Sequence, residues 1–354
     1  MKRTQNRILA LCVALAAGLF FPVSGRAEDN GDSNRLHIYN WYYYIPDSII
    51  EKFEKEYGVT VIYDQFQSEE DMYARIAAGG SGYDIVFSSQ EYTSLMIGQG
   101  MFERIDKSRL PNLQNLDPAV LRKAAHDPDM DYAVPYYFGA ACIVVNTARV
   151  PKFERSWSIF ARSDLGGRMT MLDSMREVTG AALNFLGYSV NTKNPAEIKA
   201  AGELINTRWK PNLMKFDTEI FGKAYADGDL WVVQGYPEVV LEEIAGNAQL
   251  RKDTVFFIPP EGGPSYIDSM CILKGSQNIG LAHKFIDFIH RPEIYAEFTD
   301  FFNFPSTVNI SARSLKKEPP CITEKDILGT ELQYGLGEAR NYYDEAWLNI
   351  RAGR

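Results

Sequence analysis

Residues 36–100 alternate between strand-like and helix-like segments, and this alternation restricts the fold more than any other feature of the chain. Apolar runs typical of strands lie at 36–41, 59–66 and 83–89. Segments with helical spacing or helix start and stop signals follow them at 48–58, 68–80 and 91–100. Strands that alternate with helices favour an α/β fold, in which a parallel or mostly parallel sheet is covered by helices on both faces.

Two of these strand ends carry side chains suited to binding. The first strand runs into a row of rings from Trp41 to Tyr44, and the third ends in the polar stretch from Ser88 to Glu91. Ligands of parallel sheets bind beyond the carboxyl ends of the strands. Both stretches are therefore candidate parts of a binding site.

The second half of the chain predicts another α/β unit. Extended apolar segments near 136–146 and 256–272 each continue from one predicted unit into the other. Two sheets joined by such crossings leave a cleft between two lobes.

The N-terminus has the pattern of an export signal, which we exclude from the fold. Basic residues precede an uncharged apolar run from Ile8 to Phe21, and small residues offer a cleavage site at Ala27. A second interpretation is a lipoprotein box that ends at Cys12. Either one predicts an exported protein, periplasmic or held at the membrane by a lipid.

The charge of the chain argues against nucleic acid as a partner. The net charge is −9, and residues 1–27 carry four basic and no acidic groups, which leaves about −13 on the remainder. Nucleic-acid binding needs a basic surface, whereas an acidic protein attracts cations. No phosphate loop, zinc-ligand spacing, nucleophile elbow or dinucleotide fingerprint is present, so we expect no cofactor and no metal. Cys142, Cys271 and Cys321 are expected to be free thiols, although export would permit one disulfide.

The motifs of the mature chain resemble, in order, those of bacterial spermidine/putrescine-binding proteins of ABC importers. The stretches that carry this resemblance include "YNWYYYIPDSIIEKFEKEYGVTVIY", "YDIVFSS", "YAVPYYFGAACIVVN", "IDSMCIL", "FPSTVN" and "NIRAGR". The resemblance implies a monomeric, two-lobed periplasmic receptor of type II that closes on a polyamine and presents it to a membrane permease. We expect an N-terminal lobe of 28–139 with 267–313, and a C-terminal lobe of 140–266 with 314–354.

The resemblance also implies a set of ligand-binding residues. Trp41 and Tyr44 correspond to rings that enclose the methylene chain, and Asp268 to the central anionic ligand. Glu177 corresponds to a second carboxylate that takes an amine. The remaining positions implied are Ser89, Tyr236, Tyr266, Phe304 and Gln333.

Several positions depart from the family pattern and leave the length of the ligand open. Ser174 stands where a spermidine-preferring relative can carry an acid, and Glu91 where some relatives have Tyr. Tyr236 is the ring nearest to a missing Trp, and Glu238 offers an acid close to it. Tyr42 and Asp173 are further, weaker candidates.

Two other functions stay open from the sequence. Ferric-ion receptors of similar architecture use neighbouring tyrosines, and such pairs occur at 136–137 and 342–343. A carbohydrate-acting enzyme would need a pair of carboxylates, although no spacing in this chain singles one out.

Overall fold

A computed structural model describes residues 34–42, 44–79 and 82–352. The predicted export signal with Cys12, and Tyr43 within the row of rings, lie outside the described residues. Among those residues, no helix has the length and apolar character needed to cross a membrane. Cys142, Cys271 and Cys321 are free thiols, as predicted.

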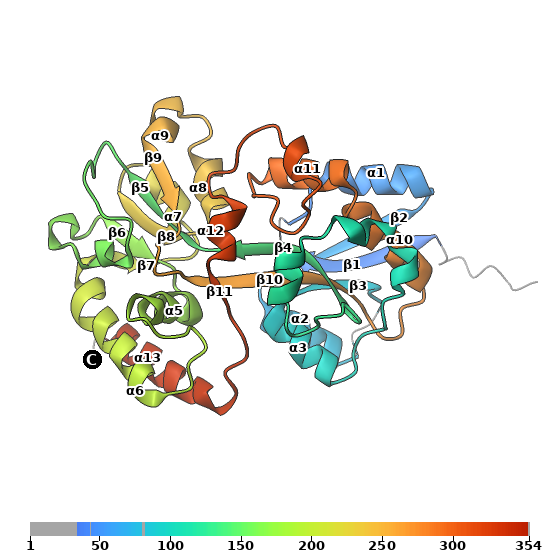
Figure 1. The fold of residues 1–354 in the computed structure, drawn as a ribbon, viewed down its shortest axis with the longest axis horizontal. Helices are drawn as coiled ribbons and strands as arrows, with labels where there is room; N and C mark the ends of the chain where they lie inside the picture. The colour runs from blue at the N-terminus through green and yellow to red at the C-terminus, as the bar shows by residue number, and fades with distance from the viewer. Residues whose placement is uncertain (1–33, 43, 80–81, 353–354) are drawn as a thin grey trace, which may run out of the picture. The chain divides into compact units, whose positions relative to one another are not determined.

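Six of the described strands form the first sheet (Figure 1). They are β1 (Arg35–Trp41), β2 (Thr60–Phe66), β3 (Ile85–Ser89), β4 (Ala133–Ala140), β10 (Pro264–Ile272) and β11 (Glu331–Leu332). The order is β11-β10-β3-β1-β2, and β4 also pairs with β10. β1 is parallel to β2 and β3, as the strand–helix alternation predicts. β10 is antiparallel to both β3 and β4, because the chain returns to this sheet through a turn from the second sheet rather than through a helical crossover.

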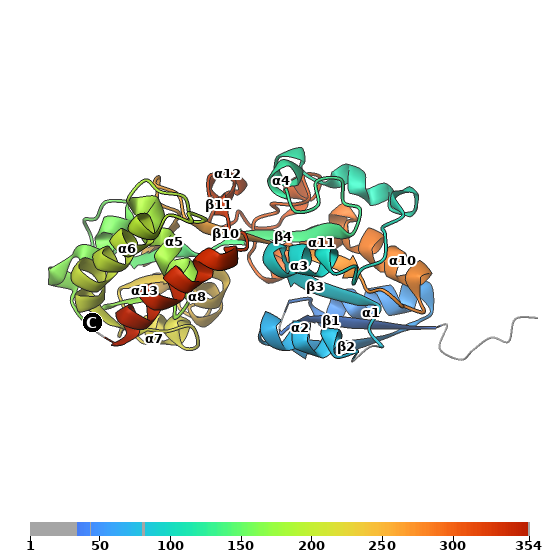
Figure 2. The ribbon, with the colours of Figure 1, turned by 90° about the horizontal axis from the view of Figure 1, so that it is seen from below.

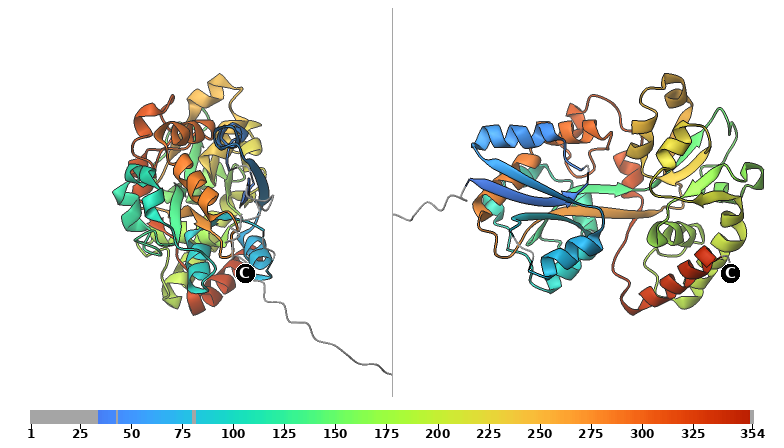
Figure 3. Two further views of the ribbon diagram at one scale, coloured as in Figure 1. Left: turned by 90° about the vertical axis from the view of Figure 1, so that its right-hand side faces the viewer. Right: turned by 180° about the vertical axis from the view of Figure 1, so that it is seen from behind.

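Helices cover both faces of the first sheet, as Figures 1 and 3 show from opposite sides. α1 (Asp47–Tyr57), α10 (Ile279–Ile289) and α11 (Pro292–Phe301) pack on the face of Ile38 and Phe87. α2 (Glu69–Ala77) and α3 (Gln90–Gly98) pack on the face of Tyr39 and Val86. Successive residues of a strand point to opposite faces, so the near-continuous apolar runs of β1 and β3 match a sheet that is buried on both sides.

Local signals fix two of these helix ends as expected. Gly58 ends α1 in the left-handed conformation (φ 66°), which glycine adopts without steric cost. The Ser68 side chain accepts a hydrogen bond from the Asp71 amide and caps α2. This cap makes Glu69 the first residue of α2.

Five described strands form the second sheet, in the order β7-β6-β8-β5-β9. They are β5 (Cys142–Asn146), β6 (Met169–Met171), β7 (Leu213–Phe216), β8 (Val232–Gly235) and β9 (Thr254–Phe257). The helices around it are α5 (Met175–Phe185), α6 (Pro195–Leu204), α7 (Phe221–Ala226), α8 (Pro237–Glu243), α9 (Ala248–Asp253) and α13 (Arg340–Ala352). α13 packs along α6 and α5 (Figure 2).

The chain passes between the two sheets where the sequence predicts it. Ala141 separates β4 from β5, and residues 258–263 separate β9 from β10. Two short helices, α4 (Pro118–Lys123) and α12 (Glu324–Leu328), precede β4 and β11. β11 pairs with Pro264 and Ser265 at the start of β10, and both paired segments fall in the ranges that we assign to the C-terminal lobe. The exact lobe boundaries stay a prediction.

Candidate ligand-binding site

The two strand ends singled out from the sequence lie at one edge of the first sheet. β1 ends at Trp41 and β3 ends at Ser89, and these strands are neighbours and parallel. β10 brings Asp268 to the same place, because Asp268 is the direct partner of Ser89 in the antiparallel pairing. Side chains of directly opposed residues lie on the same face of a sheet. The pairing therefore joins residues that are 179 positions apart.

Asp268 is a buried carboxylate that is bound by Tyr44. The Tyr44 hydroxyl donates a hydrogen bond of 2.6 Å to Oδ2 of Asp268. Asp268 is only 4% exposed. Burial raises the pKa of Asp268 to about 7, and the Tyr44 hydrogen bond opposes that rise. No ion pair among the described residues includes Asp268. The carboxylate thus lacks a basic partner in the part of the chain that the structure describes.

Aromatic rings surround this acid. Tyr44 packs edge-on against Phe304 at 6.3 Å between ring centroids, and Phe304 stacks on Tyr137 at 4.1 Å. Tyr266 and Tyr236 form a perpendicular pair at 6.1 Å. The structure therefore brings four of the predicted aromatic residues into one neighbourhood.

The Tyr266 ring occupies space that is open because residue 139 is a glycine and has no side chain. Gly139 is the partner of Tyr266 in the pairing of β4 with β10. A Cβ atom at this position would lie 2.5 Å from the Tyr266 hydroxyl oxygen and 2.7 Å from the Tyr137 ring. Only glycine lets both rings lie against this strand.

Trp41 closes the same edge from β1. Its ring packs against Phe66 at 4.7 Å between centroids, and it contacts the cores on both faces of the sheet. The indole Nε1 is buried and has no hydrogen-bond partner. A buried donor without a partner is unusual, because it costs about 1–3 kcal/mol.

Glu177 is a second buried carboxylate and comes from α5, beside the second sheet. Its Oε1 accepts a hydrogen bond of 2.8 Å from Nε2 of Gln333, whereas its Oε2 is buried without a partner. Burial raises the pKa of Glu177 to about 7. The Gln234 amide donates to the Glu177 backbone carbonyl at 3.2 Å, and its own Oε1 also lacks a partner. Glu177 and Gln333, two predicted site residues, are thus in direct contact.

Glu238 lies in the first turn of α8 and near the same rings. Burial raises its pKa to about 7. Its negative charge in turn contributes to the raised pKa values of Tyr137, Tyr236 and Tyr266. This weaker candidate is therefore close to the aromatic group.

Three other weaker candidates have different surroundings. The Asp173 side chain is exposed and pairs with Arg351. Ser174 caps α5 by accepting a hydrogen bond from the Glu177 amide at 3.4 Å. Tyr42 is 64% exposed. The structure does not gather Asp173 and Tyr42 with the buried acids, and their part in binding stays a prediction.

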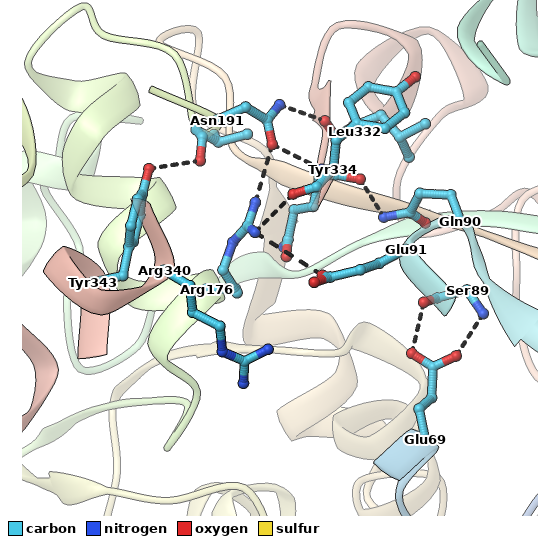
Figure 4. Close-up of polar contacts among 12 residues, drawn as sticks. Glu69, Ser89, Gln90, Glu91, Arg176, Asn191, Leu332, Tyr334, Arg340 and Tyr343 are labelled. Carbon is cyan, nitrogen blue, oxygen red and sulfur yellow. Dashed lines mark hydrogen bonds and ion pairs between the residues drawn. The ribbon is translucent and has the colours of Figure 1, made fainter. Parts of the chain in front are cut away.

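Sequence reasoning missed Glu69, which binds Ser89. Both Glu69 carboxylate oxygens accept hydrogen bonds from Ser89, at 2.7 Å from the amide and 2.6 Å from the hydroxyl (Figure 4). Ser89 has the N-cap position of α3, but its hydroxyl binds Glu69 instead of the helix backbone. An acid at a helix start is usually explained by the helix dipole, so the sequence alone gave no reason to place Glu69 in the site.

Polar contacts of Gln90 and Arg176 lie beside the acids, and sequence reasoning missed these as well. Gln90 accepts a hydrogen bond from the Ile267 amide at 2.9 Å and donates one to the Gln333 carbonyl at 2.5 Å. Arg176 donates to the Tyr334 carbonyl at 2.9 Å and lies 4.0 Å from the Glu91 carboxylate (Figure 4). Glu91, like Asp173, thus has a cationic partner.

One tyrosine of each neighbouring pair that kept a ferric-ion site open forms a hydrogen bond elsewhere. The Tyr136 hydroxyl donates to the Tyr44 carbonyl at 2.7 Å. The Tyr343 hydroxyl donates to the Thr192 carbonyl at 2.9 Å. In the part of the chain that the structure describes, no group of three or more His, Cys, Asp or Glu side chains is arranged to hold a metal ion.

The chain forms two sheets flanked by helices, with buried acids and aromatic rings contributed by elements of both. This arrangement is typical of solute-binding proteins. The fold is the two-lobed type II fold of periplasmic solute-binding proteins. The structure superposes on that of the TpPotD lipoprotein of Treponema pallidum with a TM-score of 0.86 and 45% sequence identity, over 89% of this chain and 99% of that one.

The family profile described as "Bacterial extracellular solute-binding protein" matches residues 48–320, and the chain belongs to this family. It is 35% identical to the spermidine/putrescine-binding periplasmic protein of Escherichia coli (strain K12), over the whole of both chains. It is 30% identical to the putrescine-binding periplasmic protein SpuD of Pseudomonas aeruginosa (strain UCBPP-PA14), again over both entire chains. The resemblance drawn from the sequence motifs is confirmed.

Proposed function

We propose that this protein is the polyamine receptor of an ABC importer, and that it binds spermidine, putrescine or both. The observation that carries the proposal is the pair of buried carboxylates, Asp268 and Glu177, which join no ion pair among the described residues and come from elements that belong to different sheets or pack on them. A buried charge is costly unless it is paired. A flexible dication supplies the missing partners, one ammonium group for each acid.

The rings suit the rest of such a ligand. The methylene groups of a polyamine need flat apolar walls, which Tyr44, Tyr236, Tyr266 and Phe304 offer. Ring faces also attract cations, by about 0.5–2 kcal/mol each. Acids without rings would suit a metal ion equally well, and it is the combination that favours an organic cation.

Ligand binding would be coupled to closure of the lobes, because the ligand contacts come from both sheets. Asp268 and Tyr44 belong to the first sheet and its α1 connection, whereas Glu177 and Tyr236 belong to elements of the second sheet. A ligand held by both groups stabilises the closed arrangement of the lobes over the open one. The closed, loaded receptor would then dock on the permease as a monomer.

The proposal includes a receptor role without turnover and a location outside the cytoplasm. Relatives of this chain bear the names of periplasmic binding proteins, and one structural neighbour is a lipoprotein. We propose the periplasm, with the protein either free or held by a lipid on Cys12.

Titration calorimetry of the purified protein with spermidine, putrescine and cadaverine tests the proposal. We expect saturable binding of spermidine or putrescine, and recovery of the amine unchanged. A ferric salt serves as the comparison: a visible phenolate band, a melting temperature raised by iron, and no heat with any amine would refute the polyamine receptor.

A further inference from the structure

The position of Glu69 suggests a role beyond helix capping. Its two carboxylate oxygens take the amide and hydroxyl hydrogens of Ser89, at 2.7 and 2.6 Å. Ser89 is the direct pairing partner of Asp268. Ser89 therefore connects Glu69, which comes from α2, to Asp268, the acid at the centre of the proposed site.

The contacts of Glu69 leave room for a cation. A carboxylate offers about four lone-pair sites, and Ser89 uses two of them. The ion pairs of the described residues do not include Glu69, and the nearby Glu91 is the acid that Arg176 faces. Glu69 is thus fixed in place but not neutralised by the protein.

The surroundings of Glu69 disfavour its charge in the absence of a ligand. Burial is the largest cause that raises the pKa of Glu69, to about 8, and the charges of Asp268 and Glu91 add to it. Like charges at close range cannot all ionise without a cation between them. Repulsion among these neighbouring carboxylates thus opposes their ionisation, and a bound positive group would remove that repulsion.

Two further atoms point independently to a missing ligand. Oε2 of Glu177 and Oε1 of Gln234 lack hydrogen-bond partners among the described residues, and these two residues are 5% and 0% exposed. Both are acceptors. Buried acceptors without partners are rare in folded proteins, and a ligand rich in N–H donors would satisfy them.

We propose that Glu69 is a third ligand-binding carboxylate, which takes an additional ammonium group and makes the site prefer a triamine over a diamine. This inference rests on the proposed polyamine receptor and deepens it. Asp268 and Glu177 hold two cationic nitrogens, and Glu69 holds the third. A diamine leaves Glu69 without a partner, so a diamine gains nothing from it.

The chain offers a matched control for Glu69. Asp71 is also acidic, lies in the same first turn of α2, and has an exposed side chain. A general effect of charge on the helix dipole or on the long-range field would be shared by both positions. An effect confined to Glu69 reports its contact with the ligand.

Calorimetric titration of the wild-type protein, Glu69→Gln and Asp71→Asn with spermidine and with putrescine tests the inference. Loss of one charge-assisted contact weakens binding by about 10- to 100-fold. We expect this loss for spermidine on Glu69→Gln, with the Kd for putrescine changed by less than about threefold and Asp71→Asn like the wild type. Retained putrescine binding also shows that the variant is folded.

Other outcomes overturn the inference in distinguishable ways. Equal weakening of both amines, an unchanged spermidine affinity, or a wild-type protein that binds putrescine but not spermidine would each refute the role of Glu69 and leave the receptor function standing. A wild-type protein that binds neither amine would refute the receptor function itself.

Discussion

Replacement of Asp268 by Asn should have opposite effects on ligand binding and on the stability of the ligand-free protein. Asn keeps the size of the side chain and an oxygen that can accept the 2.6 Å hydrogen bond from Tyr44. It removes only the charge. The variant therefore isolates the electrostatic contribution of one buried carboxylate.

The magnitude follows from the pKa of Asp268. Burial raises it from 3.8 to about 7, and each pKa unit corresponds to about 1.4 kcal/mol. Ionised Asp268 thus costs the ligand-free fold up to about 4 kcal/mol, which a bound ammonium group offsets. Loss of one partner of a buried charge pair costs about 2–5 kcal/mol of binding, equivalent to roughly 30- to 5,000-fold in Kd.

The sign of the stability effect depends on pH. Because the pKa of Asp268 is higher in the folded than in the unfolded state, its contribution to stability is full below about pH 4 and is lost as the pH rises through about 7. The Asn variant does not titrate. We therefore expect Asp268→Asn to be more stable than the wild type at pH 8, by about 1–4 kcal/mol, and similar to it at pH 4.

Titration calorimetry with spermidine and urea unfolding of the ligand-free protein at pH 8 and pH 4 measure these two effects. Asp71→Asn, which removes an exposed charge, is the control for both. A spermidine affinity within threefold of the wild type would show that Asp268 does not bind an amine. A variant less stable than the wild type at pH 8 would show that the carboxylate is satisfied within the protein.

Two other expectations concern Glu177 and protons. Glu177→Gln should weaken binding less than Asp268→Asn, by about 10- to 100-fold, and by different factors for spermidine and putrescine; equal factors for both amines in a calorimetric titration would contradict this. Cation binding should release protons at pH 7, because acids with pKa values of about 7 to 8 are partly protonated without ligand. The binding enthalpy should then vary with the ionisation enthalpy of the buffer at pH 7, and buffer-independent heats at pH 7 would exclude such titration.

Much of the fold was predictable, because its signals are local. The apolar runs of β1 and β3, the stop at Gly58 and the cap at Ser68 each act within a few residues. The direction of β10 was not predictable in the same way, since a turn and a helical crossover can both return a chain to a sheet. Only the pairing itself distinguishes them.

The candidate site likewise contains residues that could be predicted from the sequence and residues that could not. The family resemblance named Asp268, and its place between two apolar runs agrees with a functional role, because an acid buried without a partner is costly. Glu69 lies at a helix start with other acids, where a charge is ordinary, and only its contact with Ser89 separates it from Asp71. Residues whose role depends on a contact between distant segments leave no pattern in the sequence around them.

The arrangement of charges also explains why the site should reject ligands that carry a carboxylate. A zwitterion such as an amino acid would bring a negative group toward Asp268, Glu177 and Glu238, each of which is already hard to ionise. Arg176 could attract that group, but its guanidinium donates to the Tyr334 carbonyl and faces Glu91. Repulsion of this kind contributes to specificity as much as attraction does. The excess of buried acids thus selects a ligand that is cationic at both ends, and the rings select one whose middle is apolar.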